Sequence, residues 1–219
     1  MNDTLLIILI ILVVFILTFL VYIIMNVIKN ISLIEEFGLL AKNFGTSLTL
    51  KLKIIKPLFP TLNCKYKERS LIVDDIFSGG SSANSSANTK GHASQIYVSL
   101  KNQSNFGIVF RSLSGFKDVK EYKEIKFNDE QLDRLIKIRT SNIAIAESLL
   151  KDEKLKEAFR VYYTKYQKQY PSIQLNENEI FSKNIAGMFS KYVRLMIEDR
   201  INLIFILAEK FEEIERSSK

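Results

Sequence analysis

Two carboxylates near the middle of the chain have a spacing that is suited to binding a metal ion. Asp129 and Asp133 stand four positions apart in a segment of helical character, so both would lie on one face of a helix. Such a pair can hold a magnesium ion together with substrate phosphates, or it can cap a helix and stay solvated. We favour the cap, and a divalent-metal enzyme that uses Asp129 and Asp133 is kept as an alternative hypothesis.

The other residue types that carry catalysis are scarce. The single histidine, His92, follows Gly91 in a stretch rich in serine and asparagine, and the single cysteine, Cys64, alternates with Leu62 and Tyr66 as a core residue of a strand would. Zinc needs more ligands than these two residues supply. The chain also lacks a phosphate-binding glycine motif and a serine nucleophile elbow. These absences favour a non-catalytic protein over an enzyme and predict no cofactor.

Basic residues are concentrated in one half of the chain. The formal net charge is +7, and residues 42–126 hold 14 Lys and Arg against six Asp and Glu, whereas residues 127–219 hold 16 against 15. Four of the lysines alternate with apolar residues, as on the solvent face of strands: Lys51, Lys53, Lys65 and Lys67. They are candidates for contact with anionic lipid, a plain solvated face being the commoner role. Nucleic acid is the less favoured partner.

The N-terminal stretch is the most apolar part of the sequence. Residues 5–28 carry no charge, and 24 residues at about 1.5 Å each can cross a hydrocarbon core of about 30 Å. The run is too long for a cleaved signal peptide and has no basic start. It predicts a single transmembrane helix, a signal anchor within residues 1–30.

The charges that flank this stretch predict an orientation. No Lys or Arg precedes it, whereas Lys29 and Lys42 follow it, and such an excess marks the cytoplasmic side. We therefore expect a single-pass membrane protein whose N-terminus lies outside and whose domain is cytoplasmic. The lone Cys64 agrees with a reducing compartment.

The rest of the chain predicts an α+β fold. Residues 31–46 read as an amphipathic connecting helix that begins at Ser32 and ends at Gly45, and residues 47–219 as one α+β domain with a low-complexity loop at 78–94. Alternating apolar and polar residues predict strands at 48–54, 62–66, 71–77, 96–100, 106–110 and 135–139 and a hairpin at 172–184. Apolar residues at helical spacing predict helices at 141–150, 152–170 and 188–215. We expect an antiparallel sheet of six to eight strands packed against the C-terminal helices.

Four short segments resemble those of known proteins. They are residues 40–45 (Leu-Ala-Lys-Asn-Phe-Gly), 64–73 (Cys-Lys-Tyr-Lys-Glu-Arg-Ser-Leu-Ile-Val), 127–133 (Phe-Asn-Asp-Glu-Gln-Leu-Asp) and 138–141 (Ile-Arg-Thr-Ser). With the N-terminal anchor, their order resembles a loose group of uncharacterised membrane-anchored bacterial and archaeal proteins. Members often have glycine where this chain has Cys64 and Asn128. The resemblance implies an anchored α+β domain and assigns no functional residue.

Together these features favour a binding protein. The leading hypothesis is a membrane-tethered, non-catalytic binding or accessory module that recruits a protein partner at the cytoplasmic membrane face. An anionic-lipid-sensing domain that uses the basic strands is the first alternative, and the metal enzyme is the second. The lipid bilayer and a protein partner are the expected partners.

Overall fold

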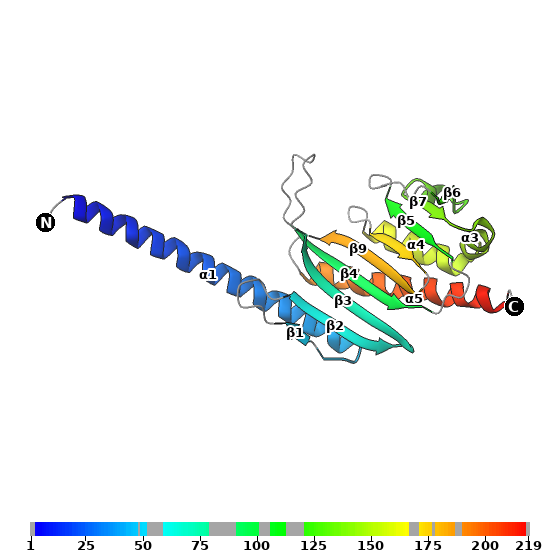
Figure 1. Ribbon diagram of the computed structural model, residues 1–219, viewed down its shortest axis with the longest axis horizontal. Coiled ribbons are helices and arrows are strands. Elements are labelled where there is room, and N and C mark those ends of the chain that lie inside the picture. The colour runs from blue at the N-terminus through cyan, green and yellow to red at the C-terminus, as the bar shows by residue number, and fades with distance from the viewer. Residues whose placement is uncertain are drawn as a thin grey trace.

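The computed structural model describes residues 3–47, 49–51, 59–78, 91–100, 106–112, 121–166, 171–176, 178–186 and 190–217. Its helices are α1 (Asp3–Asn43), α2 (Glu130–Asp133), α3 (Ile143–Leu150), α4 (Glu153–Lys165) and α5 (Lys191–Ser217). Its strands are β1 (Thr49–Lys51), β2 (Phe59–Tyr66), β3 (Arg69–Ser78), β4 (Gly91–Ser99), β5 (Ile108–Ser112), β6 (Lys123–Ile125), β7 (Ile136–Thr140), β8 (Ser172–Leu175) and β9 (Glu179–Ala186). Figure 1 shows α1 projecting from an α+β domain.

The strands in the described part of the chain form one sheet in the order β1-β2-β3-β4-β9-β8-β5-β7-β6. Every neighbouring pair is antiparallel. The predicted α+β class with an antiparallel sheet and a C-terminal helix is therefore confirmed, and the nine-stranded sheet is wider than the six to eight strands expected. β4 pairs with β3 and β9, whereas β5, the next strand in the chain, pairs with β7 and β8.

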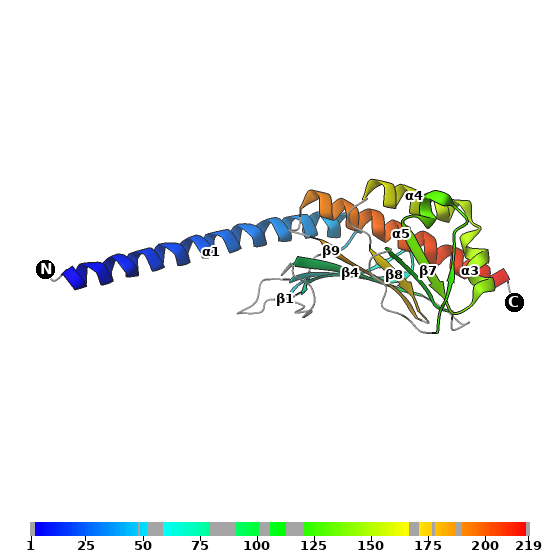
Figure 2. The same cartoon turned by 90° about the horizontal axis from the view of Figure 1, so that it is seen from above.

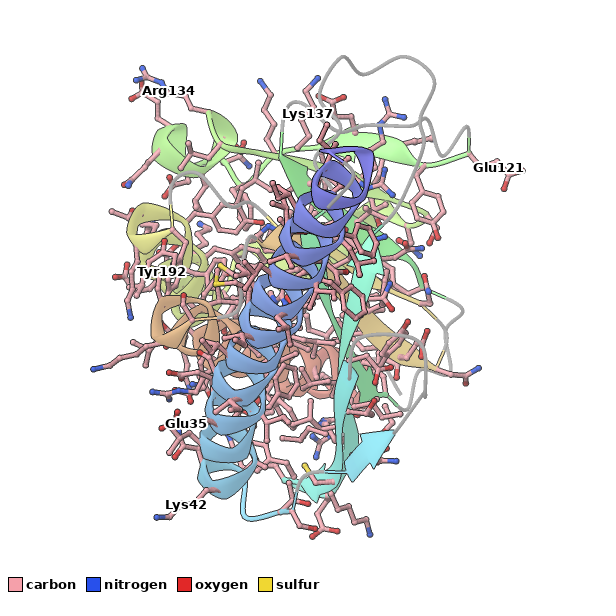
Figure 3. All side chains as sticks on the ribbon, turned by 90° about the vertical axis from the view of Figure 1, so that its left-hand side faces the viewer. Glu35, Lys42, Glu121, Arg134, Lys137 and Tyr192 are labelled. Atoms are coloured by element: carbon pink, nitrogen blue, oxygen red, sulfur yellow. The ribbon has the colours of Figure 1, made fainter. Side chains whose placement is uncertain are left out.

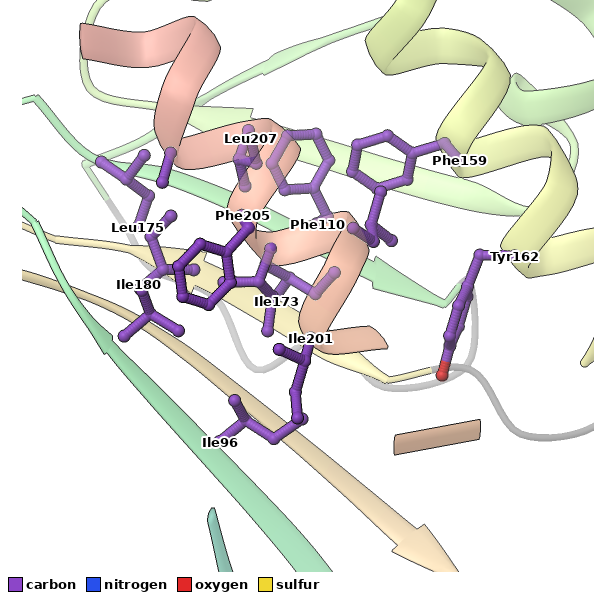
Figure 4. Packing of buried hydrophobic residues seen from close by; sticks show 14 of the residues in the cluster. Ile96, Phe110, Phe159, Tyr162, Ile173, Leu175, Ile180, Ile201, Phe205 and Leu207 are labelled. Atoms are coloured by element: carbon purple, nitrogen blue, oxygen red, sulfur yellow. The ribbon is translucent and has the colours of Figure 1, made fainter. Parts of the chain in front are cut away.

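Helices α4 and α5 and the last turns of α1 lie on the same side of the sheet (Figure 2). Strand residues alternate accordingly: Leu71 and Val73 on β3 and Ile96 and Val98 on β4 are fully buried, whereas the residues between them are partly exposed. Helix α5 runs along this face, and its apolar side chains pack on the strands, as Ile201 and Phe205 do in Figure 4. The core therefore lies in the layer between α5 and the sheet.

The last turns of α1 belong to that layer. Leu33, Phe37, Leu40 and Ala41 recur at helical spacing and are buried, which contributes about 1.5–3 kcal/mol for each of the three larger side chains. The helix ends as predicted at Gly45, whose φ is +66°. The Gly45 N–H donates to the Lys42 carbonyl and the Thr46 N–H to the Ala41 carbonyl, a Schellman cap.

The transmembrane prediction is wrong by the test of hydropathy and length. In the described ranges, no helix combines the length and apolar character that crossing a membrane requires. The apolar stretch is the first part of a 41-residue helix that runs unbroken through Lys29, Glu35 and Glu36 into the core. It is therefore not a separate spanning element. The single-pass, signal-anchor localisation with an outside N-terminus and a cytoplasmic domain falls with it.

Two predicted boundaries also differ from the structure. Ser32 lies inside α1, so no helix begins there and the boundary between residues 30 and 31 is crossed without a break. β3 extends to Ser78 and β4 begins at Gly91, so both ends of the predicted loop at 78–94 lie in paired strands. The residues between them, 79–90, lie outside the described part of the chain.

The end of α1 yields a test with opposite signs at two glycines. Gly45→Ala should lower the free energy of unfolding by about 1 kcal/mol, because an L-residue is strained at its positive φ. Gly38→Ala should raise it by about 0.5–1 kcal/mol, because Gly38 is inside the helix and an added Cβ meets no atom within 4 Å. Urea unfolding of both full-length variants measures the difference, and equal effects would contradict the cap.

Candidate functional site

The two carboxylates predicted at positions 129 and 133 do come together, but each is held by the protein. Asp129 caps α2 by accepting the Leu132 N–H at 3.0 Å, and it accepts from Nε and Nη2 of Arg160 at 2.9 and 2.6 Å. Asp133 accepts the N–H groups of Phe127 at 2.8 Å and of Asp129 at 3.2 Å. The carboxylates therefore fix the turn that leads into α2.

The charge state of Asp129 follows from these bonds. The Leu132 N–H and the Arg160 guanidinium lower the pKa of the Asp129 carboxyl, because both stabilise its ionised form. Among the described residues, no group of three or more His, Cys, Asp or Glu is placed to hold a metal ion.

Of the four lysines predicted to contact lipid, the structure places Lys65 and Lys67 close together in the fold. Lys51 lies in β1 opposite Phe59, and Lys53 lies outside the described residues. Lys65 is exposed near the end of β2, and Lys67, in the turn that follows, forms an ion pair with Glu209 at 3.3 Å.

Lys65 and Lys67 lie far from the apolar part of α1. Tyr66, between them, packs its ring 4.9 Å from that of Phe44, just past the end of α1. Phe44 is 16 residues beyond Ile28, or about 24 Å along a helix. The arrangement does not bring these lysines to the apolar segment, and lipid contact through them stays a prediction.

The remaining nucleophile and base candidates lie on strands. Cys64 is half-buried on β2, and burial raises the pKa of its thiol, which keeps it protonated. His92 lies in β4, opposite Phe77 and Ala186, and not in a loop. The two residues are not paired in the sheet, since β3 separates β2 from β4.

The N-terminal part of α1 is the largest apolar surface of the described residues. We call residues 7–31 the arm. Seventeen large apolar side chains along it are 47–68% exposed: Ile7, Ile10, Ile11, Leu12, Val13, Val14, Phe15, Ile16, Leu17, Phe19, Leu20, Val21, Tyr22, Ile24, Met25, Ile28 and Ile31. Eight of them are consecutive, so every side of the helix is apolar.

Polar contacts fix the part of α1 that follows the arm to the domain. Arg194 on α5 bonds Glu36 on α1 at 2.7 Å and Glu198 one turn further at 2.6 Å. Glu198 also accepts from the Asn43 amide at 2.8 Å. These side chains are largely shielded from water, so the charges add directional contacts to the apolar packing of Phe37 and Leu40.

A second surface is the sheet face opposite the helices. Ile72, Tyr97 and Phe181 occupy adjacent strands in one row, and the rings of Tyr97 and Phe181 are 4.9 Å apart. These side chains are half-buried. The rings of Tyr97 and Phe181 already pack on one another.

The least expected feature is Arg200 on α5, which is 0% exposed. Its Nη2 donates to Ser94 Oγ on β4 at 2.5 Å. Neither its Nε nor its Nη1 has a hydrogen-bond partner within the described residues. Burial lowers the pKa of the guanidinium, yet arginine keeps its charge in proteins, so a cation lies in the core.

Other unsatisfied groups lie in the same layer. Ser182 on β9 is fully buried and stands opposite Ile96, two residues from Ser94 on the neighbouring strand. Ser182 Oγ and the Tyr162 hydroxyl on α4 have no hydrogen-bond partner among the described residues. Figure 4 shows the Tyr162 hydroxyl directed away from Phe159. Burial raises the pKa of Tyr162 to about 12, and the charge of Arg200 partly opposes that shift. We call Arg200, Ser94, Ser182 and Tyr162 the Arg200 cluster.

The Arg200 cluster has no motif in the sequence, although one signal for it exists. Arg200 directly precedes the apolar stretch at 201–208. It stands four residues after Met196 and four before Ile204, both of them buried, so helical spacing alone places it on the apolar face of α5. No comparable pattern marks Ser94 and Ser182, which are small polar residues in ordinary strands.

Comparison with known proteins does not assign the chain to a family. No protein-family model matches the chain, and neither does any curated protein sequence. Among solved structures, the chain is similar to the mycobacterial trehalose monomycolate transport factor A, TtfA, with a TM-score of 0.49 and 9% sequence identity. The match covers 84% of this chain and 95% of that one. At this level of similarity we draw no argument from it, and the predicted resemblance to a membrane-anchored group stays a prediction.

The geometry of Asp129 predicts a pH-dependent stabilisation. A carboxyl whose pKa is lowered by folding stabilises the fold above its unfolded pKa, about 3.9, and loses that effect as the pH falls through the folded value. Asp129→Asn should lower the free energy of unfolding by about 1–2 kcal/mol at pH 7 and by much less near pH 2. Urea unfolding at both pH values measures this.

The matched control is Glu130→Gln, a carboxylate next in sequence whose side chain is 81% exposed. It should change stability by less than about 0.5 kcal/mol. Magnesium at millimolar concentration should leave the wild-type midpoint unchanged. A clear rise with Mg²⁺ that Asp129→Asn abolishes would favour the metal-enzyme alternative.

Proposed function

We propose that the protein is a non-catalytic binding module that recruits a protein partner, and that the arm is the element that the partner binds. The observation that carries the proposal is the exposure of apolar side chains on all sides of a helix that is fixed to a folded domain. An apolar surface of this extent is a recognised mark of an interaction site.

The composition of the arm restricts the partner. Between Leu5 and Ile28 the chain has no charged residue, so an acidic or basic partner surface would gain no ion pair there. A flat surface would cover only one side of the helix and leave the other in water. The matching partner therefore has a deep apolar groove that encloses the helix, the helix-in-groove mode of recognition.

The domain supports this role by holding the arm in place. The α1 helix continues unbroken from the arm into the core, where Phe37 and Leu40 are buried and Glu36 is paired with Arg194. A partner then binds a helix that is already formed, which lowers the entropy cost of binding. The bonds at Asp129 and Asp133 likewise support a structural and not a catalytic use of those carboxylates.

Photo-cross-linking in cells tests the proposal. A photoreactive residue at Leu12, Leu17 or Tyr22 should give an adduct with the same protein at all three positions, because steps of five residues place them on different sides of the helix. The matched control is Val161 on α4, an apolar side chain of similar exposure, 56%, outside the arm. It should not give that adduct.

The purified partner provides the decisive measurement. Leu17→Glu should weaken its binding to the full-length chain by at least about tenfold, because a charge would enter an apolar groove, whereas Val161→Glu should leave it unchanged. Adducts with lipid alone, or a purified partner that binds both variants equally, would overturn the proposal.

A further inference from the structure

We infer that the Arg200 cluster is a binding site for the carboxylate of a small, otherwise apolar molecule. The inference is independent of the arm and of any protein partner.

The first support is an uncompensated charge. Removing a cation from water is costly unless an anion or several hydrogen bonds replace its hydration. Among the described residues, Arg200 has one hydrogen bond, to Ser94, and the groups that interact with its charge are Tyr162 and Tyr163. Asp199, its sequence neighbour, is instead bound by Lys165 and by the Tyr166 hydroxyl, each at 2.7 Å.

The second support is the kind of group left unsatisfied. Nε and Nη1 of Arg200 are donors only, and the hydroxyls of Ser182 and Tyr162 can also donate. An ionised carboxylate is an acceptor only and has two oxygens, which suits the two unpaired donors of the Arg200 guanidinium. An alcohol or an amine would bring further donors and leave the charge uncompensated.

The charge balance selects the carboxylate among anions. The cluster holds one cation, and the nearby carboxylate of Asp199 is already neutralised. A carboxylate brings one negative charge and leaves the layer neutral. A phosphate monoester brings nearly two at neutral pH and would leave a buried excess.

The surroundings select an apolar remainder. Ile96 and Ile201 are fully buried next to the cluster, on β4 and α5. Three tyrosine rings lead from it to the surface: Tyr162 and Tyr166 are 5.0 Å apart, and Tyr166 and Tyr192 are 5.6 Å apart. Tyr192 is 50% exposed and lies at the outside of the molecule in Figure 3. Aliphatic or aromatic groups pack well on such rings.

Calorimetry of the full-length protein at pH 7 tests this with 3-phenylpropionate as the probe and 3-phenylpropan-1-ol as its uncharged match. The acid should bind at least about tenfold more tightly than the alcohol. Arg200→Met should weaken binding of the acid at least about tenfold. Arg216→Met, an exposed arginine on the same helix, should leave it unchanged.

Folding of each variant is checked by circular dichroism. If Arg200→Met does not fold, Ser182→Ala keeps the charge, removes one donor and should weaken binding of the acid about threefold. The inference is overturned if the wild type does not bind the acid at about 10 mM. It is also overturned if acid and alcohol bind equally, or if a folded Arg200→Met or Ser182→Ala variant binds as the wild type does.

Discussion

The packing of α5 along one face of the sheet is the contact on which the rest of the structure depends. Its buried face, from Val193 to Phe211, meets strands that are not consecutive in sequence, and α1, α3 and α4 all pack on it from the sides. A nine-stranded antiparallel sheet with one helix-covered face needs such an element, because its apolar residues would otherwise lie in water. The direction of the arm follows from this packing, since Arg194 on α5 holds Glu36 on α1.

A cation in the middle of that packed face has a cost that apolar packing must offset. A buried arginine without a counterion is less stable than an apolar side chain of similar volume, as replacements of buried ion pairs by hydrophobic residues have shown for other proteins. Arg200 nevertheless lies between Met196 and Ile204, at the position where α5 faces Ser94. A binding role accounts for the presence of a residue that the stability of the core alone would disfavour.

Much of the local structure follows from the sequence because it is set by neighbours in the chain. Gly45 ends α1, Asp152 caps α4, and the alternation of Leu62, Cys64 and Tyr66 gives β2. The features that could not be predicted from the sequence depend on contacts between residues far apart in the chain. Alternation says which face a side chain takes and not which strand lies beside it, so it does not predict the β4–β9 pairing, whose partners are 80 to 94 positions apart. The core position of Arg200 likewise depends on a strand far away in the sequence, since its hydrogen-bond partner is Ser94 on β4.

Helix α5 contacts α1 through Arg194 and contributes Arg200 to the Arg200 cluster, and these two residues lie on different sides of the helix. Arg194 and Arg200 are six residues apart, which is about 9 Å along the axis and about 240° around it. Arg194 therefore faces α1 while Arg200 faces the sheet, in agreement with their partners Glu36 and Ser94. A substitution that removes the charge of Arg200 leaves the ion pairs that fix the arm in place. A variant that loses binding at the Arg200 cluster should therefore keep binding at the arm, and the reverse, because the two sites depend on different contacts of α5.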